Sequence, residues 1–403
     1  MLGFARVGRF VARTLTFPVR SVKKLLGIVA LVLFQLPVYA HSGFSSYWNM
    51  PRGVTSISHA IYHIHMVALW AGVVICVFVF SWMLFIFIRY RRSKGAVPSG
   101  VSEHLGVEIV WTIIPFVLLV VMAIPATRIL FEIHDEAKPA MTIKVTGYQW
   151  KWSYEYLDQG VRFYSQIATP QAEINNQRVP SPNFLLEVDH PLVLPVGQKI
   201  RLLITSNDVI HDWWVPDLGV KQDAIPGYVN ETWTKIDKVG TYRGECAELC
   251  GTYHGFMPIV VKAVSPAEFQ QWLAKQKVVG GGKVGKSSKP SAPLSENALL
   301  TLGKKIYEKD CAVCHQTNGK GLPPTFPALK GSPIATGPVG PHLAIVIKGK
   351  KGTAMQAFSE QLQPQELAAV VTYQRHAWGN EAINKAKGHA LVVHASDVTA
   401  AEG

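Results

Sequence analysis

One short segment of the sequence brings together four side chains that could bind a redox metal. The segment is Cys246-Ala-Glu-Leu-Cys250-Gly-Thr-Tyr-His254-Gly-Phe-Met257. Thiolate and thioether sulfur are soft donors that suit copper, and imidazole binds copper or zinc. A single-copper electron-transfer site uses one Cys, two His and a weak Met. Because this segment has two Cys, each sulfur could bridge two metal ions, and a second His must come from elsewhere.

His211 is the leading candidate for that second His, because it follows an apolar strand where a loop would present it. Two other interpretations stay open at this point. Cys246 and Cys250 could form a disulfide in an oxidising compartment, or the two Cys, His254 and His211 could hold structural zinc. Neither interpretation uses Met257, so the spacing favours copper.

A second segment, Cys311-Ala-Val-Cys314-His315, is the Cys-x-x-Cys-His motif of covalent haem attachment. The two thiols would form thioethers to the porphyrin, and His315 would bind the iron. A disulfide between Cys311 and Cys314 is the alternative. The adjacent His and a secretory topology favour haem.

Met355 is the candidate sixth ligand of that iron, because it is the only methionine after Met257. Ligation by His and Met raises the haem potential into a range useful for electron transfer. His342 is the competing candidate.

The elements around these segments begin with a membrane anchor. The chain has 403 residues, of which 48% are hydrophobic, and its mean hydropathy is +0.16. Uncharged runs over 66–88 and 109–127 are each long enough to cross about 30 Å of hydrocarbon. They predict a two-helix transmembrane hairpin over 55–132. The basic loop between them (Arg89, Arg91, Arg92 and Lys94) would be cytoplasmic by the positive-inside rule.

The topology therefore puts both soluble domains on the outer side. Residues 1–40 have the basic start, apolar run and small-residue end of a signal peptide, cut after Ala40. An uncleaved first helix is the alternative. We expect a multi-pass protein of the bacterial inner membrane, with its C-terminal domains on the periplasmic side.

The soluble part divides into two domains with different sequence patterns. Residues 138–278 contain short β-branched runs separated by turns, which predict an all-β antiparallel sandwich or barrel. The strands expected are 141–146, 184–188, 199–205, 231–237 and 257–262. Residues 279–293 are rich in Gly, Ser and Lys and predict a flexible linker. Residues 294–380 predict an all-α domain with helices over 296–308 and 364–376, and the tail over 381–403 has no assigned role.

The net charge of +13 does not indicate nucleic-acid binding. The basic residues fall in the leader, the short loop and the linker, and no stretch interleaves them with stacking aromatic side chains.

Residues 55–265 resemble subunit II of the haem–copper cytochrome c oxidases. The resemblance rests on the hairpin, the segment from Gly147 to Tyr156 (Gly-Tyr-Gln-Trp-Lys-Trp-Ser-Tyr-Glu-Tyr), the stretch from His211 to Gly227, and the Cys-x3-Cys-x3-His-x2-Met loop. It implies a cupredoxin-like barrel that holds the dinuclear copper centre CuA. The ligands it implies are bridging Cys246 and Cys250, terminal His211 and His254, and weak donors from Met257 and the Glu248 carbonyl.

The same resemblance implies three further roles. The Glu248 side chain matches a magnesium ligand at the boundary with subunit I. Trp150 matches the aromatic residue where electrons enter CuA, although a packed core tryptophan is the alternative. Glu108, at the mouth of the second span, matches the entrance of a proton path; the alternative is a solvated helix end.

Residues 294–380 resemble a small class I cytochrome c, and the fusion with a CuA subunit resembles the caa3-type oxidases. The resemblance implies the electron-input subunit of a proton-pumping oxygen reductase. It also implies partnership with subunit I and subunit III, and a cytochrome c or upstream complex as donor. A CuA-containing nitric oxide reductase is the alternative, against which the two-span hairpin and Glu108 argue. A freestanding carrier is a third possibility.

Overall fold

The computed structural model describes residues 49–97, 100, 103–135, 138–280, 293–350, 353–359 and 361–402. The predicted signal peptide over 1–40 lies outside the described residues, as does most of the predicted linker over 279–293.

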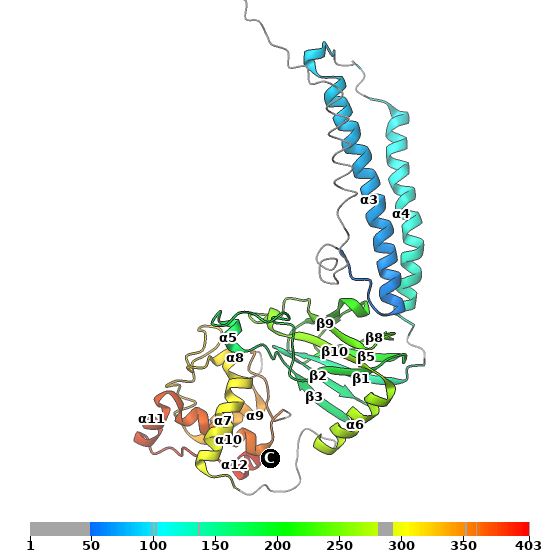
Figure 1. Ribbon diagram of the computed structural model, residues 1–403. Helices are drawn as coiled ribbons and strands as arrows, with labels where there is room; N and C mark the ends of the chain where they lie inside the picture. The colour runs from blue at the N-terminus through cyan, green and yellow to red at the C-terminus, as the bar shows by residue number, and fades with distance from the viewer. Residues whose placement is uncertain are drawn as a thin grey trace, which may run out of the picture. The chain divides into compact units, whose positions relative to one another are not determined.

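Two long antiparallel helices form the predicted hairpin (Figure 1). They are α3 (Ser56–Arg89) and α4 (Leu105–Ile133), with the short 3-10 helix η1 (Arg92–Lys94) between them. Both are long and apolar enough to cross a membrane, so the prediction of two spans is confirmed. Each helix extends beyond its uncharged run, because polar residues at its ends continue the helical backbone outside the ~20 residues that a bilayer requires.

Hydrogen bonds fix one end of each long helix to the β domain. Thr55 caps α3 in a capping box with Ser58, and its hydroxyl donates to the Leu218 carbonyl at 2.9 Å. At the end of α4, the Trp233 indole donates to the Glu132 carbonyl at 3.0 Å. The hairpin therefore meets the domain at defined residues of both helices.

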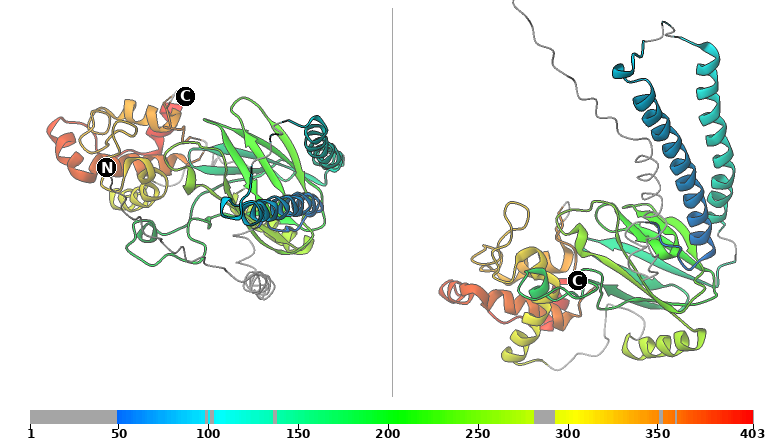
Figure 2. Two further views of the ribbon diagram at one scale, coloured as in Figure 1. Left: turned by 90° about the horizontal axis from the view of Figure 1, so that it is seen from above. Right: turned by 45° about the horizontal axis from the view of Figure 1, so that its top comes forward.

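The β domain consists of two five-stranded sheets (Figures 1 and 2). One has the order β3-β2-β1-β5-β8 and the other the order β4-β10-β9-β6-β7. The strands are β1 (Met141–Tyr148), β2 (Lys151–Tyr156), β3 (Val161–Ser165), β4 (Leu192–Pro195), β5 (Ile200–Ser206), β6 (His211–Val215), β7 (Val220–Ala224), β8 (Asn230–Thr234), β9 (Gly240–Cys246) and β10 (Pro258–Val264). Short helices interrupt or follow them: α5 (Gln171–Ile174), η2 (Pro216–Leu218), η3 (His254–Phe256) and α6 (Pro266–Gly280).

The predicted all-β class is confirmed, but the prediction of a wholly antiparallel sheet is wrong. Strand β1 pairs in parallel with β5, and β10 pairs in parallel with β4. Parallel partners require a long connection rather than a tight hairpin, and both pairs join strands that are distant in sequence.

The strand predicted over 184–188 is also wrong. This segment forms turns, and only Val188 makes an isolated bridge, to Ile167. Leu185 has a φ of +60°, a left-handed conformation that a strand does not contain.

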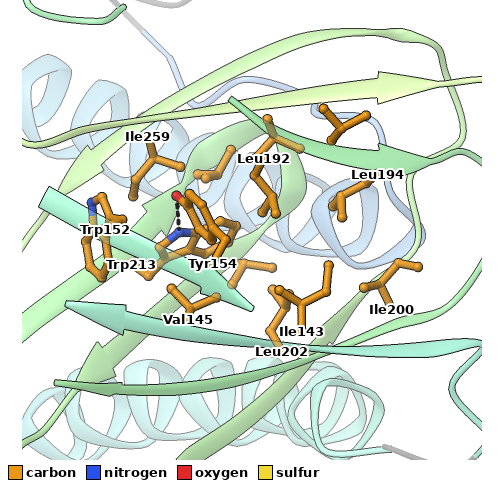
Figure 3. Packing of buried hydrophobic residues seen from close by; sticks show 14 of the residues in the cluster. Ile143, Val145, Trp152, Tyr154, Leu192, Leu194, Ile200, Leu202, Trp213 and Ile259 are labelled. Atoms are coloured by element: carbon orange, nitrogen blue, oxygen red, sulfur yellow. Dashed lines mark hydrogen bonds between the residues drawn. The ribbon is translucent and has the colours of Figure 1, made fainter. Parts of the chain in front are cut away.

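Alternating apolar residues of the two sheets meet in one core (Figure 3). Ile143 and Val145 of β1 face this core together with Trp213 of β6, and all three are fully buried. The Trp213 indole donates to the Tyr154 hydroxyl at 3.3 Å, so these two buried polar-tipped rings are hydrogen-bonded inside the core. Burying each such side chain contributes about 1.5–3 kcal/mol or more. This core supports the strands that end at the site described below.

The C-terminal domain is helical, as predicted. Its elements are α7 (Glu296–Ile306), the π-helical turn η4 (Tyr307–Cys311), α8 (Ala312–His315), α9 (Val339–Lys348), α10 (Pro364–His376), η5 (Ala377–Gly379), α11 (Asn380–Ala386) and α12 (Ala395–Glu402). Helix α10 has the predicted bounds, whereas α7 ends two residues early in the π turn. Helices α7 and α10 approach closely at Gly303, where a Cβ atom would lie 2.0 Å from the Ala369 carbonyl oxygen.

The tail after residue 380 packs onto α10. Val393 and Val398 are fully buried in the same apolar cluster as Leu367 of α10. Arg375, also fully buried, donates to the Ala390 carbonyl at 2.7 Å. Because these contacts hold part of its core, residues 381–402 complete the helical domain.

We expect the double substitution Val393→Ser/Val398→Ser to destabilise the helical domain by about 3 kcal/mol or more, because two fully buried apolar side chains are lost. Urea unfolding of the purified chain, followed by haem absorbance, measures this change. Ala400→Ser, at an exposed position of α12, is the control. Equal midpoints for the two variants would contradict a structural role for the tail.

Candidate functional site

The metal-binding candidates of the β domain come from two neighbouring strands and one loop. His211 begins β6, and Cys246 ends β9. These strands pair with Trp213 opposite Cys246, which brings the two candidates together. The prediction that a loop presents His211 is therefore wrong, since the residue belongs to the strand. The remaining candidates lie in the β9–β10 connection: Cys250, His254 and Met257.

Two sulfur atoms and two imidazole nitrogens form the centre of the site. The Sγ atoms of Cys246 and Cys250 are 3.9 Å apart. Cys246 Sγ lies 3.9 Å from His211 Nδ1, and Cys250 Sγ lies 3.6 Å from His254 Nδ1. Each sulfur therefore has its own imidazole.

Each sulfur also has its own weaker donor. Cys250 Sγ lies 3.5 Å from the Met257 sulfur, and Cys246 Sγ lies 3.3 Å from the Glu248 carbonyl oxygen. The donor set thus consists of two similar halves, each with one thiol, one imidazole and one weak donor.

This arrangement distinguishes between the interpretations left open by the sequence. Both cysteines are free thiols, so there is no disulfide between Cys246 and Cys250 in the structure. The donor atoms of His211, Cys246 and Cys250 lie within 4.8 Å of one another, and His254 stands outside this group. One tetrahedral zinc ion binds all its donors at about 2.0–2.3 Å and would hold them all within that distance. The extended set fits two ions better than one.

The two thiols influence each other's ionisation. The hydrogen bond with Cys250 lowers the pKa of Cys246 to about 4, with a further contribution from His211. The hydrogen bond with Cys246, together with burial, raises the pKa of Cys250 well above its ordinary value. The Trp150 side chain opposes this shift. A pair of thiols that shares a proton in this way becomes fully deprotonated when cations bind.

Asp208 orients the imidazole of His211. Its Oδ1 atom lies 2.8 Å from His211 Nε2, which leaves Nδ1 facing Cys246. The other carboxylate oxygen accepts a hydrogen bond from the Gln149 backbone at 2.7 Å, so Asp208 is itself held in place. Sequence reasoning missed this residue, although an acid three positions before a candidate ligand is a usable signal.

The haem-attachment candidates lie at the start of the helical domain. Cys311 ends the π turn, and Cys314 and His315 belong to α8. His315 Nδ1 lies 2.8 Å from the Pro327 carbonyl oxygen, which fixes the ring and leaves Nε2 available. Burial raises the pKa of both thiols, that of Cys314 to about 12, and lowers the pKa of His315. Two free thiols beside an imidazole with one oriented nitrogen fit a covalently attached haem.

The two candidates for the sixth iron ligand are both in the helical domain. Met355 lies in the loop after α9, half-buried against the apolar cluster of this domain. His342 lies in the first turn of α9 and is buried.

Trp150 is almost fully covered, with 7% of its surface exposed. Its ring centroid lies 5.0 Å from that of Tyr253, in the metal-binding loop, and 5.8 Å from that of Phe326, in the helical domain. Phe326 directly precedes Pro327, the hydrogen-bond partner of His315. Sequence reasoning missed this contact, because nothing in the local pattern relates residues so far apart.

Lys151, next to Trp150, lies between the same two domains. It is 4% exposed, and its ammonium lies 5.1 Å from the Tyr164 ring and 5.4 Å from the Phe358 ring. It also donates a hydrogen bond to the Gln361 side chain. Burial lowers the pKa of Lys151, and Asp310 opposes the shift.

Of the other two carboxylates named by the sequence, Glu108 is partly buried and Glu248 is exposed. Glu108 is in the first turn of α4, and its Oε1 atom accepts a hydrogen bond from the His104 backbone at 3.3 Å. Glu248 is exposed in the metal-binding loop, where only its backbone carbonyl contacts a thiol.

A two-helix membrane anchor, a β domain with a paired thiol and imidazole site, and a haem-type helical domain define a membrane-bound electron-transfer protein. Models of the transmembrane and periplasmic domains of cytochrome c oxidase subunit II match residues 44–129 and 141–264. A model described as cytochrome c oxidase, cbb3-type, subunit III matches residues 298–373. This chain belongs to the cytochrome c oxidase subunit II family, with a fused cytochrome c domain.

Individual relatives and one solved structure are similar to parts of this chain. A probable cytochrome c oxidase subunit 2 of Rickettsia bellii is 37% identical over 266 residues, which are 66% of this chain and 97% of the relative. The mitochondrial cytochrome c oxidase subunit 2 of Glycine max is 38% identical over 60% of this chain and 62% of the relative. The crystal structure of the periplasmic domain of subunit II of cytochrome oxidase of Bradyrhizobium japonicum is 45% identical, with a TM-score of 0.31, over 35% of this chain and 96% of that one.

Several of the predicted properties follow from membership of this family. The chain is a component of an oxidoreductase complex and a partner of subunit I, and the two families imply copper as CuA and haem c. It is a membrane protein with a periplasmic domain. The expectation of a multi-pass protein is corrected to two passes, because the part of the chain that the structure describes has two candidate spans.

We expect Asp208→Ala to lower copper affinity by about 10–100-fold, because loss of the hydrogen-bond partner of a metal-binding imidazole typically has an effect of this size. Competition of the purified chain with a copper chelator measures the affinity. Asp237→Ala removes a carboxylate at an exposed position away from the site and serves as the control. Equal affinity of the two variants would contradict the orienting role of Asp208.

Proposed function

We propose that this chain is the electron-input subunit of a proton-pumping cytochrome c oxidase, in which a covalently bound haem c and a dinuclear CuA centre act in series. The observation that carries the proposal is the donor set in two similar halves around Cys246 and Cys250. A two-metal centre uses every donor of this set.

In the proposed copper centre, the thiolates of Cys246 and Cys250 and the imidazoles of His211 and His254 would hold the ions. Met257 and the Glu248 carbonyl are weak ligands. Bound copper would supply one-electron redox chemistry. The chain's own contribution is rigidity: His211, Cys246 and Met257 are each at the end of a strand or next to one and are buried against the core. Donors held in this way change position little between oxidation states.

In the proposed haem site, Cys311 and Cys314 would attach the haem through thioethers, and His315 and Met355 would bind its iron. Bound haem would supply a one-electron couple whose potential His/Met ligation raises. Pro327 holds the His315 ring through its carbonyl oxygen, which fixes the orientation of that ligand. Met355 packs against the apolar cluster of the helical domain.

The proposed order of transfer is external donor, helical domain, copper domain and then subunit I. The support is the chain of contacts from His315 through Pro327 and Phe326 to the ring of Trp150. On the copper side, a Cβ atom at Gly251 would lie 3.1 Å from the Trp150 ring, so the indole packs directly on the loop after Cys250. We propose Trp150 as the entry residue of the copper centre.

The partner face is proposed from exposed apolar residues around the copper ligands. Leu249, beside Cys250, is 78% exposed. Other large apolar side chains are exposed in nearby loops: Ile210, Tyr228 and Val229. Exposed apolar groups at one end of a domain are typical of an interface, and we propose that subunit I covers them. The Glu248 carboxylate, in the same loop, is a proposed magnesium ligand at that boundary.

The remaining parts of the assignment follow the family resemblance. Glu108, at the start of a membrane-spanning helix, is proposed as the entrance of a proton path, because an ionisable residue at a membrane span is a functional candidate. A cytochrome c or an upstream complex is the proposed donor, subunit III a proposed further partner, and a bacterial inner membrane the proposed location. Oxygen uptake without nitric oxide turnover by the purified complex would separate this proposal from a nitric oxide reductase.

We expect the intact complex to contain two copper ions in this chain and to give a mixed-valence electron paramagnetic resonance signal. Cys250→Ser should abolish that signal while haem absorbance remains, since the haem-attachment cysteines are in another domain. Metal analysis and spectroscopy of both forms make the measurement. Zinc, or a single copper in the wild-type chain, would contradict the dinuclear centre.

We expect Phe326→Ala to slow electron transfer from haem to copper, because it removes two aromatic pairs at the contact, each of which is worth about 0.5–1.5 kcal/mol. Rapid photoreduction of the haem, followed by the copper absorbance, gives the rate. Phe326→Tyr keeps the ring and should retain the wild-type rate. If Phe326→Ala were as fast as wild type, the contact would not belong to the electron path.

A further inference from the structure

One buried imidazole of the helical domain has no part in the relay proposed above. His342 is 1% exposed, and its Nε2 atom lies 2.8 Å from the Gln374 side-chain oxygen. Its Nδ1 atom is buried and has no hydrogen-bond partner among the described residues. An unsatisfied buried polar atom costs about 1–3 kcal/mol, so this nitrogen requires a physical explanation.

The position of His342 relates it to the haem. The Gln374 amide that holds Nε2 also lies, through its own nitrogen, 3.9 Å from Cys311 Sγ. His342 and the proposed attachment thiol are therefore bonded to the same side chain. His342 is also near enough to His315 for that residue to influence its ionisation. His342 therefore lies beside the segment that carries Cys311 and His315.

The hydrogen bond to Gln374 selects the chemical form of the ring. Because an amide oxygen accepts from Nε2, the proton is on Nε2 and Nδ1 has a free lone pair. Burial lowers the pKa of His342 to about 4, which keeps the ring neutral near pH 7. Neutral imidazole is the form that binds metals, and it is a common axial ligand of haem iron.

The two candidate ligands, His342 and Met355, belong to different kinds of backbone segment. His342 is part of helix α9, and α10 holds its ring through Gln374. Met355 is in a loop, where it is held by bonds from Lys350 N to its carbonyl at 2.8 Å and from its own N–H to Thr353 Oγ1 at 3.2 Å. A loop ligand leaves its position more easily than a side chain held between two helices.

We propose that Nδ1 of His342 is a reserve axial donor to the haem iron, which binds the iron when the sulfur of Met355 leaves it. This inference rests on the proposed haem site. The exchange breaks one iron–sulfur bond and forms one iron–nitrogen bond, with no electron or proton transferred. Its consequence is a lower haem potential, because Met/His ligation is what raises it, so a chain that has lost the methionine ligand would become a poorer acceptor.

The test uses the intact complex carrying Met355→Ala. With His342 present, we expect a six-coordinate, low-spin haem with two nitrogen axial ligands and a lowered potential. Adding His342→Gln should convert it to a high-spin haem. Glutamine can still donate to Gln374 from a position close to Nε2, so this variant removes chiefly the proposed donor. His376→Gln, at a histidine bonded to Glu296 near the surface, is the matched control and should leave the low-spin form unchanged.

The possible results separate this inference from the proposed function. A high-spin haem in Met355→Ala alone would overturn the reserve role and leave Met355 as the resident ligand. A changed axial ligation in His342→Gln alone would also overturn it, because the nitrogen would then be the resident ligand and the assignment of Met355 would fall with it. Optical and electron paramagnetic resonance spectra, with haem content as the control for folding, give these readouts without any measurement of turnover.

Discussion

The pairing of strands β6 and β9 is the constraint on which the copper donor set depends. His211 and Cys246 are 35 residues apart in sequence, and only the register that puts Trp213 opposite Cys246 brings their donor atoms together. A slip of one residue would turn each side chain to the other face of the sheet. The buried bond between Trp213 and Tyr154 of the opposite sheet holds that register. The aromatic core therefore determines the geometry of the metal site, although none of its residues is a ligand.

The sequence alone predicted those elements and ligands that a local residue pattern determines. The membrane helices follow from uncharged length, α10 from its apolar period and its initial proline, and the thiol, imidazole and thioether donors from their spacing. Prediction from the sequence failed where contacts between distant segments determine the local structure. Phe184 to Val188 has the composition of a strand, but a left-handed Leu185 and only a single bridge leave it in turns. The local sequence predicted a loop at His211. The residue instead begins β6, a strand that forms only by pairing with β7 and β9.

Contacts between segments far apart in sequence are the other part that could not be predicted. Nothing in the local sequence around Phe326 indicates that its ring meets that of Trp150. The tail after residue 380 carries no recognisable motif, so the sequence alone assigns it no role. Yet Val393 and Val398 are fully buried, and Arg375 is fully buried under the same segment. A few well-placed side chains are enough when a preformed helical surface receives them.

Two opposing effects meet at Lys151, between the copper and haem domains. Taking an ammonium out of water costs several kcal/mol, and the Lys151 ammonium donates to a neutral amide, that of Gln361. The Tyr164 and Phe358 rings return part of that cost, since each cation–π contact is worth about 0.5–2 kcal/mol. The aromatic contacts of Phe326 add a similar amount. Because the favourable and unfavourable effects are of comparable size, the contact combines close approach of the two redox domains with a modest net free energy of association.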